Sequence, residues 1–127
     1  MRPTILLTFL LAFSAASSSA QGTWGGSLPD PGEQAEQQTR MMRDSLGLSS
    51  AQTERIATVN ATYALRQQEA RDNNDGDFKA LRETMRALQQ EQDAELKRYL
   101  TSDQWTAWTR IRERQRQARM QSYRGRQ

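Results

Sequence analysis

From residue 33 onward, apolar side chains recur three or four positions apart, which is the spacing of one face of an α-helix. The pattern divides into four stretches. The first covers residues 33–46 and ends before Gly47, a residue type that tolerates the positive φ of a helix C-cap. The later breaks fall at Ser49, at the polar run 72–77 and at Thr101. We therefore predict four helices and an all-α fold.

The two middle helices carry matching seams. The seam of the second helix consists of Gln52, Ile56, Val59, Tyr63, Arg66 and Ala70. The third helix is predicted to be capped by Asp77, and its seam consists of Phe78, Leu81, Met85, Leu88, Gln92, Leu96 and Tyr99. Each helix would be roughly 23 residues and ~35 Å long. Equal lengths and a short turn predict a long antiparallel hairpin with shorter flanking helices.

This seam is narrow and interrupted by polar side chains. At ~25 cal/mol per Å², its burial barely offsets the entropy of ordering two rods. We therefore expect a cradle-like hairpin that a second copy completes as a homodimer. Leu65 lies off the seam and is interpreted either as part of the dimer seam or as an exposed contact. In the fourth helix, Trp105 and Trp108 are predicted to fold that helix back over the hairpin end.

The first 20 residues have the three parts of a secretion signal. Arg2 supplies positive charge, residues 5–13 form an apolar run too short for a bilayer of ~30 Å, and residues 18–20 give a small-residue cleavage site. We predict cleavage after Ala20, export to the periplasm and no membrane anchor. Residues 21–32, with four glycines and two prolines, are interpreted as a flexible leader. A helical domain over 33–122 and a basic tail over 123–127 follow.

A five-residue pattern, L-[ST]-x-x-Q, occurs twice, at 48–52 and at 100–104. In each copy the hydroxyl can accept a hydrogen bond from the N3 amide, while the glutamine accepts one from the N-cap amide. Such a capping box stabilises a helix start by about 1 kcal/mol. We therefore assign a structural role to the motif residues, which are Leu48, Ser49, Gln52, Leu100, Thr101 and Gln104.

Behind an export signal, the two motifs resemble the LTxxQ-motif family of small periplasmic helical proteins, the Spy/CpxP family. The resemblance covers roughly residues 40–115, including MMRDSLGLSSAQ and DAELKRYLTSDQWTAW, and departs at Ser49, where the family usually has threonine. It implies a cradle-shaped antiparallel dimer. It also implies one of three functions. These are an ATP-independent chaperone for unfolded or misfolded envelope proteins, a modulator docking on the periplasmic domain of an envelope-stress sensor kinase, and a metal-responsive protein. The histidine ligands usual in the metal branch have no counterpart here.

Composition narrows the possible chemistry. The chain has no Cys and no His, which excludes disulfides, zinc sites built on thiolate or imidazole, and catalysis by cysteine or histidine. The DNNDGD run at 72–77 is superficially similar to a calcium loop. Asp77 stands where such a loop requires glycine, however, and the helical pattern resumes at Phe78, so we interpret the run as a turn. We expect no enzymatic activity, no cofactor and no metal site.

Basic charge is concentrated at the C-terminus. Residues 110–127 contain seven arginines and one glutamate, which gives a net charge of +6. This segment either attracts acidic partners or is a solvated helix end. Nucleic acid is not an expected partner, because only one aromatic residue lies among the arginines. The leading hypothesis is a periplasmic chaperone, with the sensor modulator as the alternative. Client contacts are predicted at Arg82, Arg86, Arg110, Arg112 and Arg114.

Overall fold

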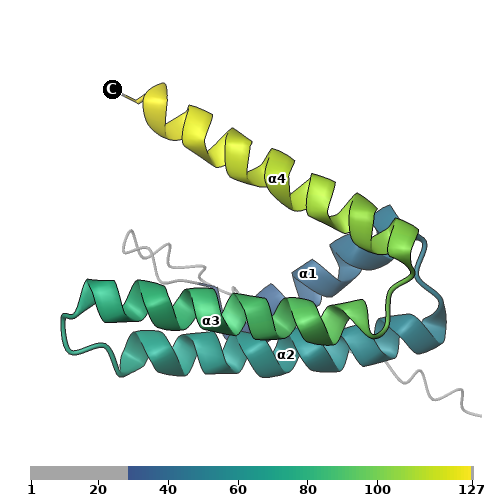
Figure 1. The fold of residues 1–127 in the computed structure, drawn as a ribbon, viewed down its shortest axis with the longest axis horizontal. Coiled ribbons are helices and arrows are strands. Elements are labelled where there is room, and N and C mark those ends of the chain that lie inside the picture. Colours follow the sequence, from purple (N-terminus) through teal and green to yellow (C-terminus); the bar gives the residue numbers. More distant parts are fainter. Residues whose placement is uncertain (1–28, 127) are drawn as a thin grey trace, which may run out of the picture.

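A computed structural model describes residues 29–126, which form four helices and contain no strand. The helices are α1 (Pro31–Leu46), α2 (Ser50–Asp72), α3 (Phe78–Lys97) and α4 (Ser102–Arg124). Their order and type confirm the predicted all-α fold (Figure 1). The expected signal, its cleavage site and most of the leader lie outside the described residues. Within the described range, no helix is both long enough and apolar enough to cross a bilayer.

Local capping sets the helix boundaries. The Asp30 side chain accepts a hydrogen bond from the Gly32 amide at 3.0 Å, and Pro31 takes the first helical position, where a missing N–H has no helical partner to lose. As a result, α1 starts two residues earlier than predicted, inside the expected leader. At its other end, Gly47 has φ 62° and ψ 45°, the left-handed C-cap conformation that the sequence predicts. The last helix continues to Arg124, two residues beyond the predicted domain.

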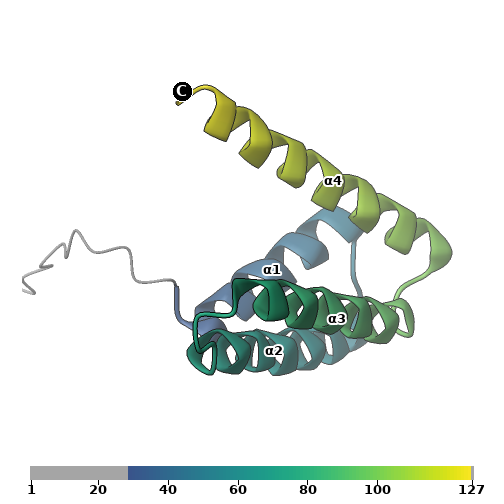
Figure 2. The ribbon, with the colours of Figure 1, turned by 60° about the vertical axis from the view of Figure 1, so that its left-hand side comes forward.

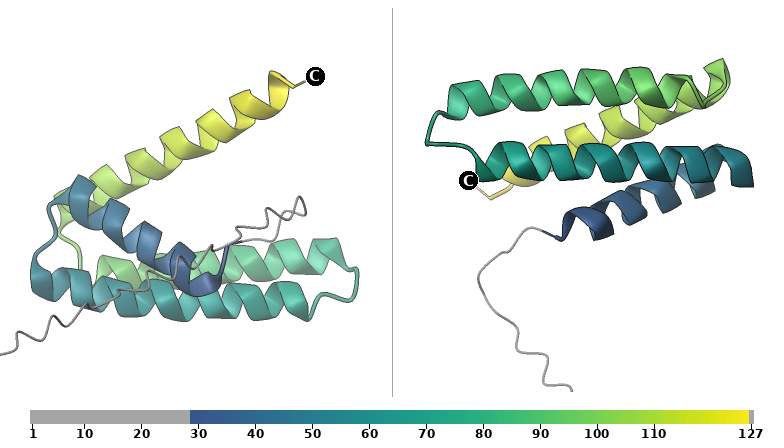
Figure 3. Two further views of the ribbon diagram at one scale, coloured as in Figure 1. Left: turned by 180° about the vertical axis from the view of Figure 1, so that it is seen from behind. Right: turned by 90° about the horizontal axis from the view of Figure 1, so that it is seen from below.

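The α2 and α3 helices lie side by side and antiparallel, as predicted, and a short turn joins them (Figures 1 and 3). Gly76 in the turn has a φ of 88°, which a residue with a Cβ rarely adopts. Asp77 then accepts a hydrogen bond from the Ala80 amide at 3.0 Å and caps α3. The polar run at 72–77 therefore ends one helix and starts the next.

The hydrophobic core draws on all four helices of one chain. Its buried residues are Met42, Ile56, Val59, Tyr63, Leu88, Leu96 and Trp108. Met42 of α1 and Trp108 of α4 cover the narrow seam between α2 and α3. Part of the seam is thus buried within one chain, whereas Leu81 and Met85 nearer the hairpin tip are only partly buried. The homodimer stays a prediction.

Three residues near the seam lie away from this core. Phe78 was predicted to belong to the seam, but it is 66% exposed because it sits at the hairpin tip, which α1 and α4 do not cover (Figure 1). Arg66 is also exposed, and its Nη1 lies 3.0 Å from Oε2 of Glu91. Leu65 is 57% exposed, so both interpretations of this residue stay open.

The α4 helix packs on the bundle only through its first half. Trp108 is 2% exposed and Trp105 packs partly buried against the core, so the two tryptophans hold the start of α4 on the hairpin end as predicted. Its second half stands clear of the hairpin, and the two enclose an open angle (Figures 2 and 3). Every residue from Arg116 to Arg126 is exposed.

Candidate binding surface

Both sequence motifs form the predicted capping boxes. The Ser49 hydroxyl accepts a hydrogen bond from the Gln52 amide at 3.1 Å, and Oε1 of Gln52 accepts one from the Ser49 amide at 3.0 Å. The Thr101 hydroxyl and the Gln104 amide are 3.2 Å apart, and Oε1 of Gln104 lies 3.0 Å from the Thr101 amide. These bonds fix the starts of α2 and α4 and confirm the two predicted capping boxes.

The two motif glutamines also contact each other. Nε2 of Gln52 donates to Oε1 of Gln104 at 2.8 Å and to the carbonyl of Tyr99 at 2.9 Å. Nε2 of Gln104 donates to the carbonyl of Leu46 at 3.3 Å. Each glutamine therefore caps its own helix and also binds a carbonyl at the end of another helical segment. This contact holds the starts of α2 and α4 together at the base of the hairpin.

A buried polar network crosses the middle of the bundle. Asn60 is 1% exposed, and its Nδ2 donates to the Thr39 hydroxyl at 3.0 Å. Its Oδ1 accepts a hydrogen bond from Nε2 of Gln92 at 3.0 Å. Thr39 in turn donates to the carbonyl of Ala35 at 2.9 Å. The Asn60 amide thus joins α1, α2 and α3. Buried polar groups whose hydrogen bonds are all satisfied specify the positions of packed helices relative to one another.

An ion pair fastens the first half of α4 to α3. The Arg112 guanidinium makes two bonds to the Asp93 carboxylate, at 2.7 and 3.0 Å, with both side chains about three-quarters buried. The same guanidinium lies 5.4 Å from the ring centroid of Trp105 and 5.9 Å from that of Trp108. Gln89 also donates to Asp93 at 2.9 Å. Arg112 therefore stabilises the junction between the two helices.

The other predicted client-contact residues are all exposed. Arg82 and Arg86 lie on α3, and Arg110 and Arg114 lie on α4. None of these four side chains makes an ion pair within residues 29–126. Their role in client contact stays a prediction. Arg112 differs from them, because its guanidinium is already engaged by Asp93.

A cleft of about 610 Å³ opens between α1 and the middle of α4. Its volume falls in the range of ligand pockets, which is about 300–1,000 Å³. Three arginines line the α4 side, namely Arg112, Arg116 and Arg119, and Trp108 lies among them. The remaining polar lining is rich in one residue type: Gln34, Gln37, Gln38, Gln67, Gln89 and Gln115. Among residues 29–126, no carboxylate belongs to the lining of the cleft.

Much of this lining has unused hydrogen-bonding capacity. Within residues 29–126, the side chains of Gln34, Gln37, Gln38 and Gln67 have no hydrogen-bond partner, and neither does that of Arg119. The buried Nε1 of Trp108 also lacks one in this range. A buried donor without a partner costs about 1–3 kcal/mol. Sequence reasoning missed the glutamines, although the helical spacing of three of them along α1 was a usable signal.

One ion pair lies on the projecting half of α4. Arg116 donates hydrogen bonds to Glu113 at 2.8 and 3.1 Å. These bonds, followed by the guanidinium charge and a bond from Gln117, hold the pKa of Glu113 below its ordinary value of 4.5. The same partner raises the pKa of Arg116. Both groups are exposed to solvent. Their ion pair therefore arranges charges on the helix surface and does not stabilise the core.

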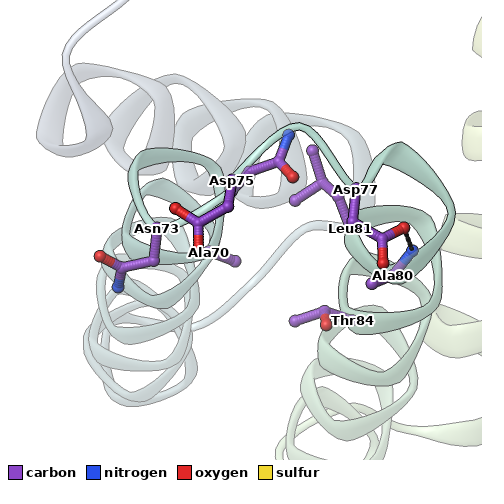
Figure 4. Close-up of a pocket in the computed structure, with 8 residues that line it drawn as sticks. Ala70, Asn73, Asp75, Asp77, Ala80, Leu81 and Thr84 are labelled. Carbon is purple, nitrogen blue, oxygen red and sulfur yellow. Dashed lines mark hydrogen bonds between the residues drawn. The ribbon is translucent and has the colours of Figure 1, made fainter.

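A second depression lies at the hairpin tip, with a volume of about 380 Å³ (Figure 4). Asp77 turns toward the Ala80 amide, and Asp75 lies on the side of the turn near Ala70. In the part of the chain that the structure describes, no three acidic side chains converge as metal ligands do. The tip is therefore best described as a capped turn.

One comparison with known proteins gives a match. A family model described as "Domain of unknown function (DUF4890)" matches residues 20–108. The matched range contains both L-[ST]-x-x-Q motifs and ends within α4, before its projecting half. No curated protein and no solved structure matches the chain.

Proposed function

The chain belongs to the family of helical proteins described as DUF4890, and we propose that it is an ATP-independent chaperone that holds unfolded proteins of the cell envelope. On this proposal, residues 1–20 direct export and are removed after Ala20, and the mature chain acts in the periplasm. The resemblance of its two motifs to the Spy/CpxP family supports the same function.

A single observation carries the proposal. Within residues 29–126, nothing packs over the second half of α4, where every residue from Arg116 onward is exposed, and this half combines basic with apolar side chains. Met120 is 54% exposed and Tyr123 is 71% exposed. Around them lie Arg116, Arg119 and Arg124, all of which are exposed. Guanidinium groups attract acidic segments, and the apolar side chains retain them through weak contacts.

The rest of the fold is suited to presenting this helix. The glutamine contact at the hairpin base and the pair between Asp93 and Arg112 fix the first half of α4. The second half of α4 extends from that fixed base into solvent. We call its exposed residues, 116–124, the exposed arm. Weak contacts along an exposed arm let a client leave and refold without an energy source. Because the attraction is partly electrostatic and lies at the surface, it is expected to weaken as salt rises.

An aggregation assay tests this function. The mature chain is mixed in stoichiometric amounts with a reduced, aggregating client, and light scattering is followed. We expect the mature chain to suppress scattering, and the variant Met120→Ser/Tyr123→Ser to suppress it much less. Phe78→Ser, which removes a similarly exposed apolar group from the hairpin tip, is the matched control and should behave like the parent. A mature chain that leaves aggregation of several clients unchanged would overturn the proposal.

A further inference from the structure

The cleft between α1 and α4 differs in character from the exposed arm beside it. Its α1 wall presents glutamine amides, including Gln34 and Gln38, and its α4 wall presents Arg119. Two of the three guanidinium groups in the lining are already paired, Arg112 with Asp93 and Arg116 with Glu113. Arg119 has no acidic partner within residues 29–126. One free positive charge therefore faces a wall of neutral donors and acceptors.

A glutamine amide offers both a donor and an acceptor, as a peptide group does. A row of such amides can hydrogen-bond the main chain of an extended segment whatever its side chains are. The buried N–H of Trp108, which belongs to the same lining, is a further donor without a partner in the described part of the chain.

We infer that this cleft binds an extended, acidic segment of an unfolded polypeptide. Arg119 pairs with a carboxylate of the segment, and the amides of Gln34 and Gln38 hydrogen-bond its peptide groups. The inference rests on the proposed function and names the site and the kind of client sequence that it prefers.

Charge and hydrogen-bonding capacity favour this occupant. In the described part of the chain the cleft is lined by arginines and by no carboxylate, so an acidic segment is attracted and a basic one is repelled. A phosphate-bearing ligand would need several free guanidinium groups, whereas Arg119 alone among the lining arginines lacks an acidic partner within residues 29–126. The unpaired amides instead match a ligand with many alternating donors and acceptors, which an extended peptide main chain is.

Peptide binding tests the site directly. The probe is a short, unstructured, fluorescently labelled peptide rich in glutamate and serine, compared with one in which lysine replaces each glutamate. Anisotropy with the mature chain should show binding of the acidic peptide that is about tenfold tighter than that of the basic one. Arg119→Gln and Gln38→Ala should each weaken acidic-peptide binding by about threefold to tenfold. The matched controls are Arg40→Gln, at an exposed arginine of α1 outside the cleft lining, and Gln90→Ala on the exposed surface of α3, and both should bind like the parent.

Further measurements distinguish a failure of the cleft assignment from a failure of the chaperone proposal. The indole N–H resonance of Trp108, assigned with Trp108→Phe, should shift when the acidic peptide is added, while that of Trp105 stays in place. Equal binding of both peptides, or no effect of Arg119→Gln, overturns the cleft assignment even if aggregation is still suppressed. Self-association in sedimentation that Arg119→Gln abolishes also overturns it, because a second copy would then occupy the cleft. A chain that binds the acidic peptide at this site but suppresses no aggregation rejects the chaperone proposal alone.

Discussion

Nε2 of Gln52 lies 2.8 Å from Oε1 of Gln104, although the two residues are 52 positions apart. The same two side chains close the capping boxes of α2 and α4. Each oxygen therefore accepts a hydrogen bond from a local amide, while each nitrogen reaches across to the other motif or to a distant carbonyl. The repeated motif is thus a joint between helices as well as a pair of helix starts.

Replacing Gln104 tests this joint. We expect Gln104→Ala to lower the free energy of unfolding by about 1–2 kcal/mol, because it removes a cap and leaves polar groups of the joint unpaired. Urea denaturation followed by circular dichroism gives the value. The control is Gln90→Ala, at an exposed glutamine of α3 that belongs to neither motif. It should change the free energy of unfolding by less than about 0.5 kcal/mol.

The double variant separates a joint from two independent caps. If the side chains act together, Gln52→Ala/Gln104→Ala should be less destabilised than the sum of the single variants, by about 0.5 kcal/mol or more. Strict additivity would mean that each glutamine serves only its own helix.

Asn60 is expected to be the most sensitive polar residue of the core. Asn60→Leu should lower stability by about 2–4 kcal/mol, since it leaves the buried amide of Gln92 without its partner and removes the hydrogen bond that the Thr39 hydroxyl accepts. Thermal unfolding monitors the change. Adding Gln92→Leu to Asn60→Leu should recover part of the loss, because both polar partners are then removed together. No recovery would show that packing, rather than hydrogen bonding, sets the effect.

Two glycines offer a matched test of backbone conformation. Gly47 has a φ of 62° and open space around its Cα, so Gly47→Ala should destabilise by about 1 kcal/mol through backbone strain alone. Gly125 has a φ of −71°, and an added Cβ would lie 3.6 Å from the Gln121 carbonyl, an ordinary contact. Gly125→Ala should therefore leave the melting temperature unchanged. Equal effects would contradict the capping role of Gly47.

The pair on α4 predicts a pH effect of defined sign. The pKa of Glu113 is lowered in the folded chain, so its contribution to helix stability is fully present above the ordinary value of 4.5. That contribution is lost as the pH falls through the lower, folded pKa. A carbon-13 titration of the carboxyl should show the lowered pKa, and Arg116→Gln should raise it toward 4.5. Arg114→Gln, on an exposed neighbour that makes no bond to Glu113, is the control and should leave it low.

Local sequence was sufficient to predict the helices and their caps. The breaks at Gly47 and at residues 72–77, and the capping boxes at Ser49 and Thr101, depend on neighbours within a few positions. A pattern of that range is visible in the sequence itself. The antiparallel pairing of α2 and α3 follows from their similar lengths and the short turn.

The burial and the partners of a residue could not be predicted where they depend on packing between distant segments. Phe78 fits the seam by spacing, but neither α1 nor α4 reaches the hairpin tip to cover it. Arg112 has the sequence context of a surface arginine, yet the angle of α4 brings it to Asp93. The cleft likewise exists only because α4 diverges from α1, so its glutamines could not be grouped before the helices were placed.

The most direct test of the chaperone proposal maps the contact surface on the folded chain. Amide resonances of the nitrogen-15-labelled mature chain are recorded while a permanently unfolded client is added. We expect signals from the second half of α4, around Met120 and Tyr123, to shift or broaden, and those around Phe78 at the hairpin tip to stay unchanged. Changes confined to the tip, or none at all at saturating client, would contradict the proposal.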